Sequence, residues 1–142
     1  MIDEKTWSAR VRRGFWHYYL RSYPCAASAG IKASNSGDCR VPMTVAGNII
    51  LSINLGANSC SAFLRPVDGA PHQPVRALLQ PSADFLVMCL GAAFEPKPDQ
   101  GFLKTQLAMG GYDPDNWSDI AEWFETSRHR YRQAVEVVVG VE

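Results

Sequence analysis

The sequence predicts an α+β fold, in which an antiparallel sheet of roughly three to five strands carries N-terminal, central and C-terminal helices packed on it. Near both ends of the chain, apolar residues recur at steps of three and four, the period of an amphipathic helix. Between the ends, residues 48–55 and 59–67 alternate apolar and polar side chains, the period of a strand with one buried face. Consecutive strands with short connections favour antiparallel pairing.

The clearest predicted element is a helix over residues 113–139. Asp113 precedes Pro114, which a first helical turn tolerates, so this carboxylate can cap the helix; Asn116 with Asp119 is the alternative cap. Acidic residues fill the first half and arginines the second, which complements the helix dipole. Valines near the end weaken helix propensity, so we expect the helix to fray or become extended before the following glycine. The apolar stripe consists of Trp117, Ile120, Phe124, Tyr131, Ala134 and Val138.

Length and composition predict one domain covering residues 1–142. Hydrophobic residues make up 46% and charged residues 20%, as in ordinary folded proteins. Fourteen basic and fourteen acidic residues cancel, so binding to nucleic acid or an anionic surface requires a local patch. The longest apolar stretch, around 83–94, is broken by Asp84 and Gly91 and is too short for a bilayer, so we expect no membrane partner.

The four cysteines show no CxxC pair and no histidine at ligand spacing. The pattern does not predict zinc, and we expect no metal or other cofactor. An even count allows two disulfides, but the start of the chain lacks an apolar signal segment, and Cys60 and Cys89 lie in apolar runs. These features favour reduced, packed thiols and a cytoplasmic location.

A first helix is expected from a cap at Asp3 to about Tyr23, because Pro24 disfavours helical geometry in the residue before it. One broad face is apolar and should point inward, while a different face collects basic side chains at steps of three and four. Such a face can bind phosphates; the alternative is a solvated face paired with acids elsewhere. The apolar face carries Trp7, Val11, Phe15, Tyr18 and Tyr19, and the basic face, called the basic strip below, carries Arg10, Arg13, His17 and Arg21.

The next segments predict a loop, an edge strand and a hairpin. Residues 25–37 are small and polar apart from Ile31, so we expect a mobile loop there. Residues 40–45 alternate and include a proline, which suits a short edge strand. Residues 56–58 form the turn of a hairpin between the two alternating stretches. The buried faces would be formed by Val41, Met43 and Val45 in the edge strand and by Ile49, Leu51, Ile53, Leu55, Cys60, Ala62 and Leu64 in the hairpin, while Phe63 and Arg65 lie on a partly covered opposite face.

Residues 66–74 contain three prolines and predict a connection. It holds His72, which has no nucleophile or carboxylate at recognisable spacing, so we identify no catalytic residue. Pro81 can open a helix over 82–93 with apolar residues on nearly every side, expected to be central; a strand over 85–90 is the alternative. Residues 101–109 predict a further strand, which ends at two glycines.

Several short motifs together resemble a family of uncharacterised prokaryotic and viral domains. They are Phe15-Trp16, the hairpin, Leu90-Gly91 at the end of an apolar helix, Leu103-Lys104-Thr105, and Asn116-Trp117 with Trp123-Phe124. The resemblance covers nearly the whole chain. Members occur alone or as the last domain of proteins with predicted restriction-endonuclease-like parts, which implies a nucleic-acid or defence context. This chain departs from the family pattern in having Asp84 without a clear glutamate in the central helix.

Three functional hypotheses follow from these residues. Asp84, Glu95-Pro96-Lys97 and Lys104 resemble the acid and lysine layout of metal-dependent nucleases. Surplus aromatics at Trp16, Tyr19, Tyr23 and Trp123 indicate either a self-associating surface or simply a larger core. The favoured hypothesis is a non-enzymatic interaction domain that binds nucleic acid or a partner protein, with a homodimer as a candidate assembly. Its predicted binding residues are Arg10, Arg13, His17, Arg21, Arg128 and Arg132.

Overall fold

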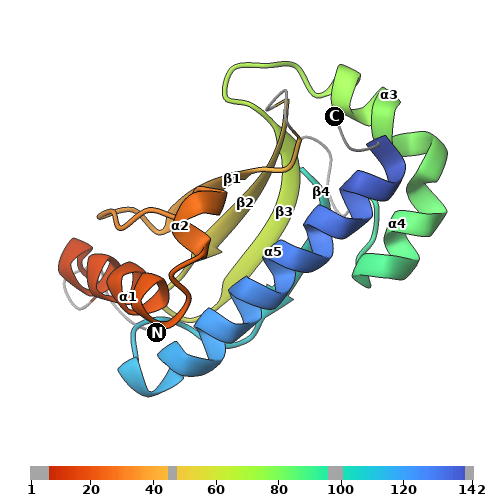
Figure 1. The fold of residues 1–142 in the computed structure, drawn as a ribbon. Coiled ribbons are helices and arrows are strands. Elements are labelled where there is room, and N and C mark those ends of the chain that lie inside the picture. Colours follow the sequence, from red (N-terminus) through yellow and green to blue (C-terminus); the bar gives the residue numbers. More distant parts are fainter. Residues whose placement is uncertain (1–6, 45–47, 96–100, 140–142) are drawn as a thin grey trace.

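The computed structural model describes residues 7–44, 48–95 and 101–139. A four-stranded antiparallel sheet is combined with N-terminal, central and C-terminal helices, so the predicted α+β class is confirmed (Figure 1). In chain order the described elements are α1 (Ala9–Ser22), α2 (Ala26–Ala29), β1 (Asp38–Pro42), β2 (Ile49–Leu55), β3 (Cys60–Pro66), α3 (Gln73–Leu79), the 3-10 turn η1 (Gln80–Ser82), α4 (Ala83–Leu90), β4 (Phe102–Leu107), the 3-10 turn η2 (Pro114–Asn116) and α5 (Trp117–Val139).

Each strand of the sheet pairs with the next one along the chain, in the order β1-β2-β3-β4. The predicted hairpin is formed by β2 and β3, with Leu55 opposite Cys60 beside the turn. The predicted edge strand is β1, although Val45 lies outside the described residues. On the other side of β3, β4 contains a bulge opposite Phe63, where Leu103 has a φ of 58°. Because a bulge interrupts the alternation of faces, Phe102 and Leu103 are both buried.

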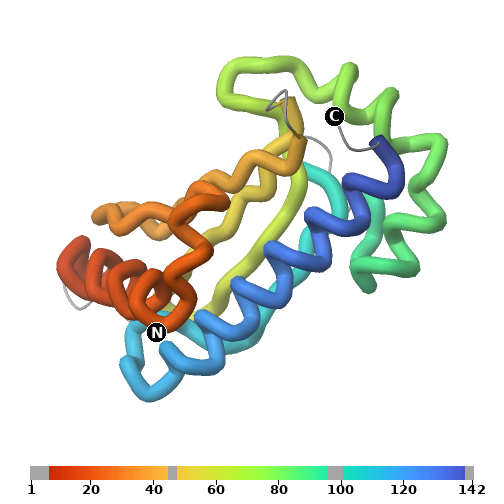
Figure 2. Tube along the Cα trace, in the orientation of Figure 1, coloured from red at the N-terminus to blue at the C-terminus, as the bar shows by residue number. Residues whose placement is uncertain are grey.

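Helix α5 crosses one face of the sheet (Figures 1 and 2). Its buried Tyr131 hydroxyl donates hydrogen bonds to the main-chain carbonyls of Leu103 and Ala62, the latter at 3.2 Å, and lies 3.0 Å from Thr105 Oγ1. One side chain therefore fixes the helix to both β3 and β4. Burial raises the pKa of Tyr131 to about 12, which keeps this hydroxyl protonated as a donor.

Helix α1 packs on the first half of α5 through aromatic rings. Phe15 meets Trp117 edge to face at 5.9 Å, and Trp16 stacks on Phe124 at 5.8 Å with an interplanar angle of 13°. Trp16 and Tyr19 have no exposed surface, so of the two alternatives the larger core holds for these two rings. These rings complete the core instead, because two aromatic helices must bury a thick layer between them.

The second face of the sheet is covered more than the alternation predicted. On β2, Ile50 is 9% exposed and Ser52 only 2% exposed, although both lie on the face away from the core. Side chains of the neighbouring strands contact Ser52 on this face. Ser52 Oγ donates to Asp38 at 2.9 Å and accepts from Arg65 at 3.3 Å, and Arg65 also pairs with Asp68. This polar network satisfies the buried hydroxyl, as a buried polar group requires.

Both terminal helices differ from prediction at one end. Helix α1 begins at Ala9, where Ser8 is the cap and accepts a hydrogen bond from the Val11 amide; the predicted cap Asp3 lies outside the described residues. The predicted end near Tyr23 is confirmed. Helix α5 continues through Val139, so the expected fraying at the valines is wrong. Burial of the helix against the rest of the fold outweighs their low helix propensity.

The segment over residues 25–37, which we expected to be a mobile loop, includes a short helix and a buried residue. It contains α2, and Ile31 is 1% exposed in the core. Two side chains of α1 bind the backbone of this segment. Trp16 Nε1 donates to the Ser36 carbonyl at 2.8 Å, and Arg12 Nε donates to the Asn35 carbonyl at 2.7 Å. Partners twenty residues away cannot be deduced from small polar residues alone.

The central helices differ most from expectation. Helix α3 was not predicted, and α4 is a surface helix in which Leu86 and Leu90 are buried while Met88 is 76% exposed. A run that is apolar on all sides suggested a buried helix, but the short α4 contacts its neighbours along one side only. All four cysteines are free thiols; Cys39 and Cys60 are packed, whereas Cys25 is exposed, contrary to expectation.

Candidate nucleic-acid interface

The basic strip lies on the outward face of α1. Arg10, Arg13, His17 and Arg21 are all exposed, as the helical spacing predicted. The opposite face holds Phe15, Trp16 and Tyr19, which are fully buried against α5 and therefore fix the rotation of the helix. The side chains of the strip lie on a rigid element, so their spacing is set before any partner binds.

Helix α1 contains four arginines and no aspartate or glutamate. Within the described part of the chain, no ion pair or hydrogen bond engages the side chains of the basic strip. The remaining arginine of the helix, Arg12, faces another way: it donates to two main-chain carbonyls and lies 5.6 Å from the centre of the Trp7 ring. Arg12 is therefore structural, whereas the strip presents its charge to solvent.

The two predicted binding arginines of α5 have carboxylate partners. The side chain of Arg128 is only 11% exposed and donates hydrogen bonds of 3.0 and 2.6 Å to Glu125. Glu125 also accepts a hydrogen bond of 3.0 Å from the Tyr19 hydroxyl. Arg132 pairs with Glu136 at 2.8 Å. Since Tyr19 belongs to the inward face of α1, Arg128 lies beneath that helix and not beside the basic strip. The structure thus groups the four α1 residues and leaves the two α5 residues in local ion pairs.

Burial alone would raise the pKa of the Glu125 carboxyl, but hydrogen bonds from Arg128 and Tyr19 outweigh it and hold this pKa below its usual range. Burial, followed by the charge of Glu125, raises the pKa of Tyr19 far above its ordinary value. The three groups therefore form a charged, hydrogen-bonded link between α1 and α5 at neutral pH. These three groups help to hold α1 in place, but they are not part of the basic strip.

The residues of the nuclease hypothesis do not form a site in the described part of the chain. Glu95 pairs with Arg76, whose hydrogen bond lowers the pKa of that carboxyl, and Asp84 lies in the exposed first turn of α4. Lys97 lies outside the described residues. Over residues 7–44, 48–95 and 101–139, no three acidic, histidine or cysteine side chains are grouped to hold a metal ion. His72 lies at the start of α3, its ring 6.2 Å from that of Phe102.

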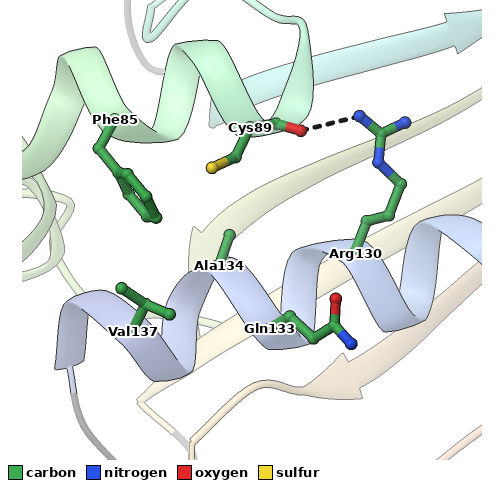
Figure 3. A pocket seen from close by; sticks show the side chains of 6 residues that line it. All are labelled: Phe85, Cys89, Arg130, Gln133, Ala134 and Val137. Carbon is green, nitrogen blue, oxygen red and sulfur yellow. Dashed lines mark hydrogen bonds between the residues drawn. The ribbon is translucent and has the colours of Figure 1, made fainter.

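A second surface feature was not predicted from the sequence. A groove of about 270 Å³ runs between α4 and α5 and is lined by Phe85, Cys89, Arg130, Gln133, Ala134 and Val137. Figure 3 shows the Phe85 ring and the Cys89 sulfur facing Ala134 and Val137, while Arg130 donates a hydrogen bond of 2.8 Å to the Cys89 carbonyl. We call it the α4–α5 groove. Only the packing of the two helices reveals it, because each contributes single apolar residues at ordinary helical spacing.

No protein-family model matches this chain, and neither a curated protein nor a solved structure shows significant similarity to it. None of the helices in the described ranges combines the length and the apolar character needed to cross a membrane.

Proposed function

We propose that this chain is a non-enzymatic interaction domain that binds the phosphate backbone of nucleic acid through the basic strip. The observation that carries the proposal is the charge of α1, which exposes three arginines and a histidine along one face and contains no acidic residue. Because the whole chain has zero net charge, it has no general attraction for anions. The local concentration of positive charge on α1 is therefore what favours an anionic partner. The resemblance to domains joined to restriction-endonuclease-like proteins supports the same context, and the free thiols support a cytoplasmic setting.

The dimensions of the strip fit a backbone contact. From Arg10 to Arg21 the helix rises about 16 Å, and duplex DNA carries one phosphate charge per roughly 1.7 Å of its axis. The three arginines can each neutralise a phosphate. The contacts proposed for the strip are to phosphates, which carry no sequence information, so we expect binding that is independent of sequence.

Fluorescence anisotropy with a labelled 20-base-pair duplex and a single strand of equal length tests the proposal. The wild-type chain should bind at low salt, and the logarithm of the association constant should fall with the logarithm of salt concentration with a slope of about −2.7 for the duplex. Arg13→Gln should reduce the magnitude of this slope by about 0.9. The matched control is Arg132→Gln, which removes the same charge from an ion pair on α5 and should bind as the wild type does.

Binding that is absent at low salt would contradict the proposal. Equal loss in Arg13→Gln and Arg132→Gln would also contradict it, because the effect would then follow net charge and not the strip. If the chain captured an acidic protein in a pull-down but did not bind nucleic acid, the basic strip would instead be assigned to a protein partner. Circular dichroism of each variant should match the wild type, since both side chains are exposed.

A further inference from the structure

The α4–α5 groove is apolar inside and has an exposed apolar side chain beside it. Met88 is 76% exposed and Val137 is 70% exposed, the two most exposed large hydrophobic side chains in the described part of the chain. Met88 follows Asp84 by four residues, so both lie on the outward side of α4, adjacent to the side that carries Phe85 and lines the groove. One short helix therefore presents both a protruding side chain and the edge of a cavity.

Side chains of opposite charge lie at the two ends of this surface. Asp84 lies in the first turn of α4, and Arg130 is bonded to the carbonyl of Cys89 near the last turn. The rise from residue 84 to residue 89 is about 7.5 Å. Neither charge forms an ion pair with another residue that the structure describes. Each is thus available to a charge of opposite sign on a partner.

We infer that this surface joins two copies of the chain into a two-fold dimer, with α4 antiparallel to α4 of the partner copy. A two-fold axis midway between positions 84 and 89 brings Asp84 of one copy to the end of α4 where Arg130 of the other lies, and the reverse contact forms at the same time. The same operation sets Met88 against the partner copy's Phe85 at the mouth of the groove. A methionine sulfur beside an aromatic ring is a favourable contact.

A second copy fits this surface better than an unrelated partner, because the complementary features all belong to one patch. Two-fold interfaces are self-complementary by definition. Here Asp84 and Phe85 lie at one end of α4, and Met88 and Arg130 lie at the other, as antiparallel pairing requires. The dimer does not depend on the proposed nucleic-acid function. In Figure 1, α1 and α4 lie near opposite ends of α5, so pairing through α4 leaves both basic strips open to solvent.

Sedimentation velocity of the full chain over a concentration series tests the inference. The wild-type chain should shift from monomer toward dimer with rising concentration. Met88→Glu should raise the dissociation constant at least tenfold, whereas Met88→Leu should change it less than threefold. Because Met88 is exposed, neither substitution should alter the circular dichroism spectrum.

A charge exchange distinguishes this two-fold pairing from any other contact. Asp84→Arg and Arg130→Glu should each be monomeric alone, because every dimer would place like charges together. Mixed in equal amounts, the two variants should form a heterodimer, since both contacts are then between opposite charges. A wild-type chain that remains monomeric at the highest concentration, a dimer that Met88→Glu does not weaken, or variants that fail to pair when mixed would overturn the inference.

Discussion

The Tyr19 hydroxyl donates a hydrogen bond of 3.0 Å to the Glu125 carboxylate, joining α1 to α5 across 106 positions of sequence. The same carboxylate receives two hydrogen bonds from Arg128 and lies 3.3 Å from His129 Nε2. Because Tyr19 lies on the face of α1 opposite the basic strip, this contact helps to set the direction in which the strip points.

Glu125→Gln should lower the free energy of unfolding by about 1–3 kcal/mol at pH 7, because Arg128 and the Tyr19 hydroxyl lose a charged acceptor in a poorly hydrated position. The pKa of Glu125 is lowered in the folded state, so its contribution is complete above the unfolded-state pKa of about 4.3 and is lost as pH falls through the lower folded-state value. The difference between wild type and variant should therefore narrow below about pH 4.3.

Urea unfolding at a series of pH values provides this measurement, with Glu122→Gln as the control. Glu122 is an exposed glutamate of the same helix, and its substitution should change stability by less than about 0.5 kcal/mol. A difference for Glu125→Gln that stays constant down to pH 3 would exclude the ionised carboxylate as its source.

Tyr131→Phe should lower the free energy of unfolding by about 1–3 kcal/mol. The substitution keeps the ring but removes the hydroxyl that donates to carbonyls of both β3 and β4. Thermal unfolding followed by circular dichroism measures the effect. Tyr112→Phe is the control, because Tyr112 is 39% exposed; equal losses in the two variants would assign the effect to tyrosine hydroxyls in general.

Gly91→Ala should cost about 1 kcal/mol of stability through backbone conformation alone. Gly91 ends α4 with a φ of 66°, and an added Cβ would have no atom of the rest of the fold within 4 Å, so overlap with other residues makes no contribution. Asparagine tolerates this left-handed region better than alanine, so Gly91→Asn should be the more stable variant in the same unfolding experiment. The opposite order would show that the cost comes from another source.

The four thiols should react with iodoacetamide in an order set by burial. Cys25 is exposed and should be alkylated first, and Cys89 second. Burial raises the pKa of Cys60 to about 11 and also raises that of Cys39, so both thiolates are scarce at pH 8 and are shielded as well. Mass spectrometry of timed samples should find Cys39 and Cys60 labelled only after denaturant is added. Rapid labelling of either thiol in the native chain would contradict the burial of these two side chains.

Local patterns in the sequence predicted most of the fold. The alternation from Ile49 to Leu64 determined the hairpin and its buried face, because a one-residue slip would turn every apolar side chain to the wrong face. The periodicity of residues 117–139 determined α5 in the same way. The bulge at Leu103 was not predictable, because the strand and the tyrosine that contact this residue are distant from it in the sequence.

The sequence by itself determined the α+β class and the four-residue basic strip, because helical and strand periods depend on neighbours a few positions apart. Tertiary structure alone decided which arginines remain available: Arg13 is exposed, whereas Arg128 is enclosed by Glu125 and Tyr19. It also decided that Met88 faces solvent beside a groove and not the core. Charge pairing and burial of this kind depend on groups that are distant in the chain, and local periodicity contains no information about them.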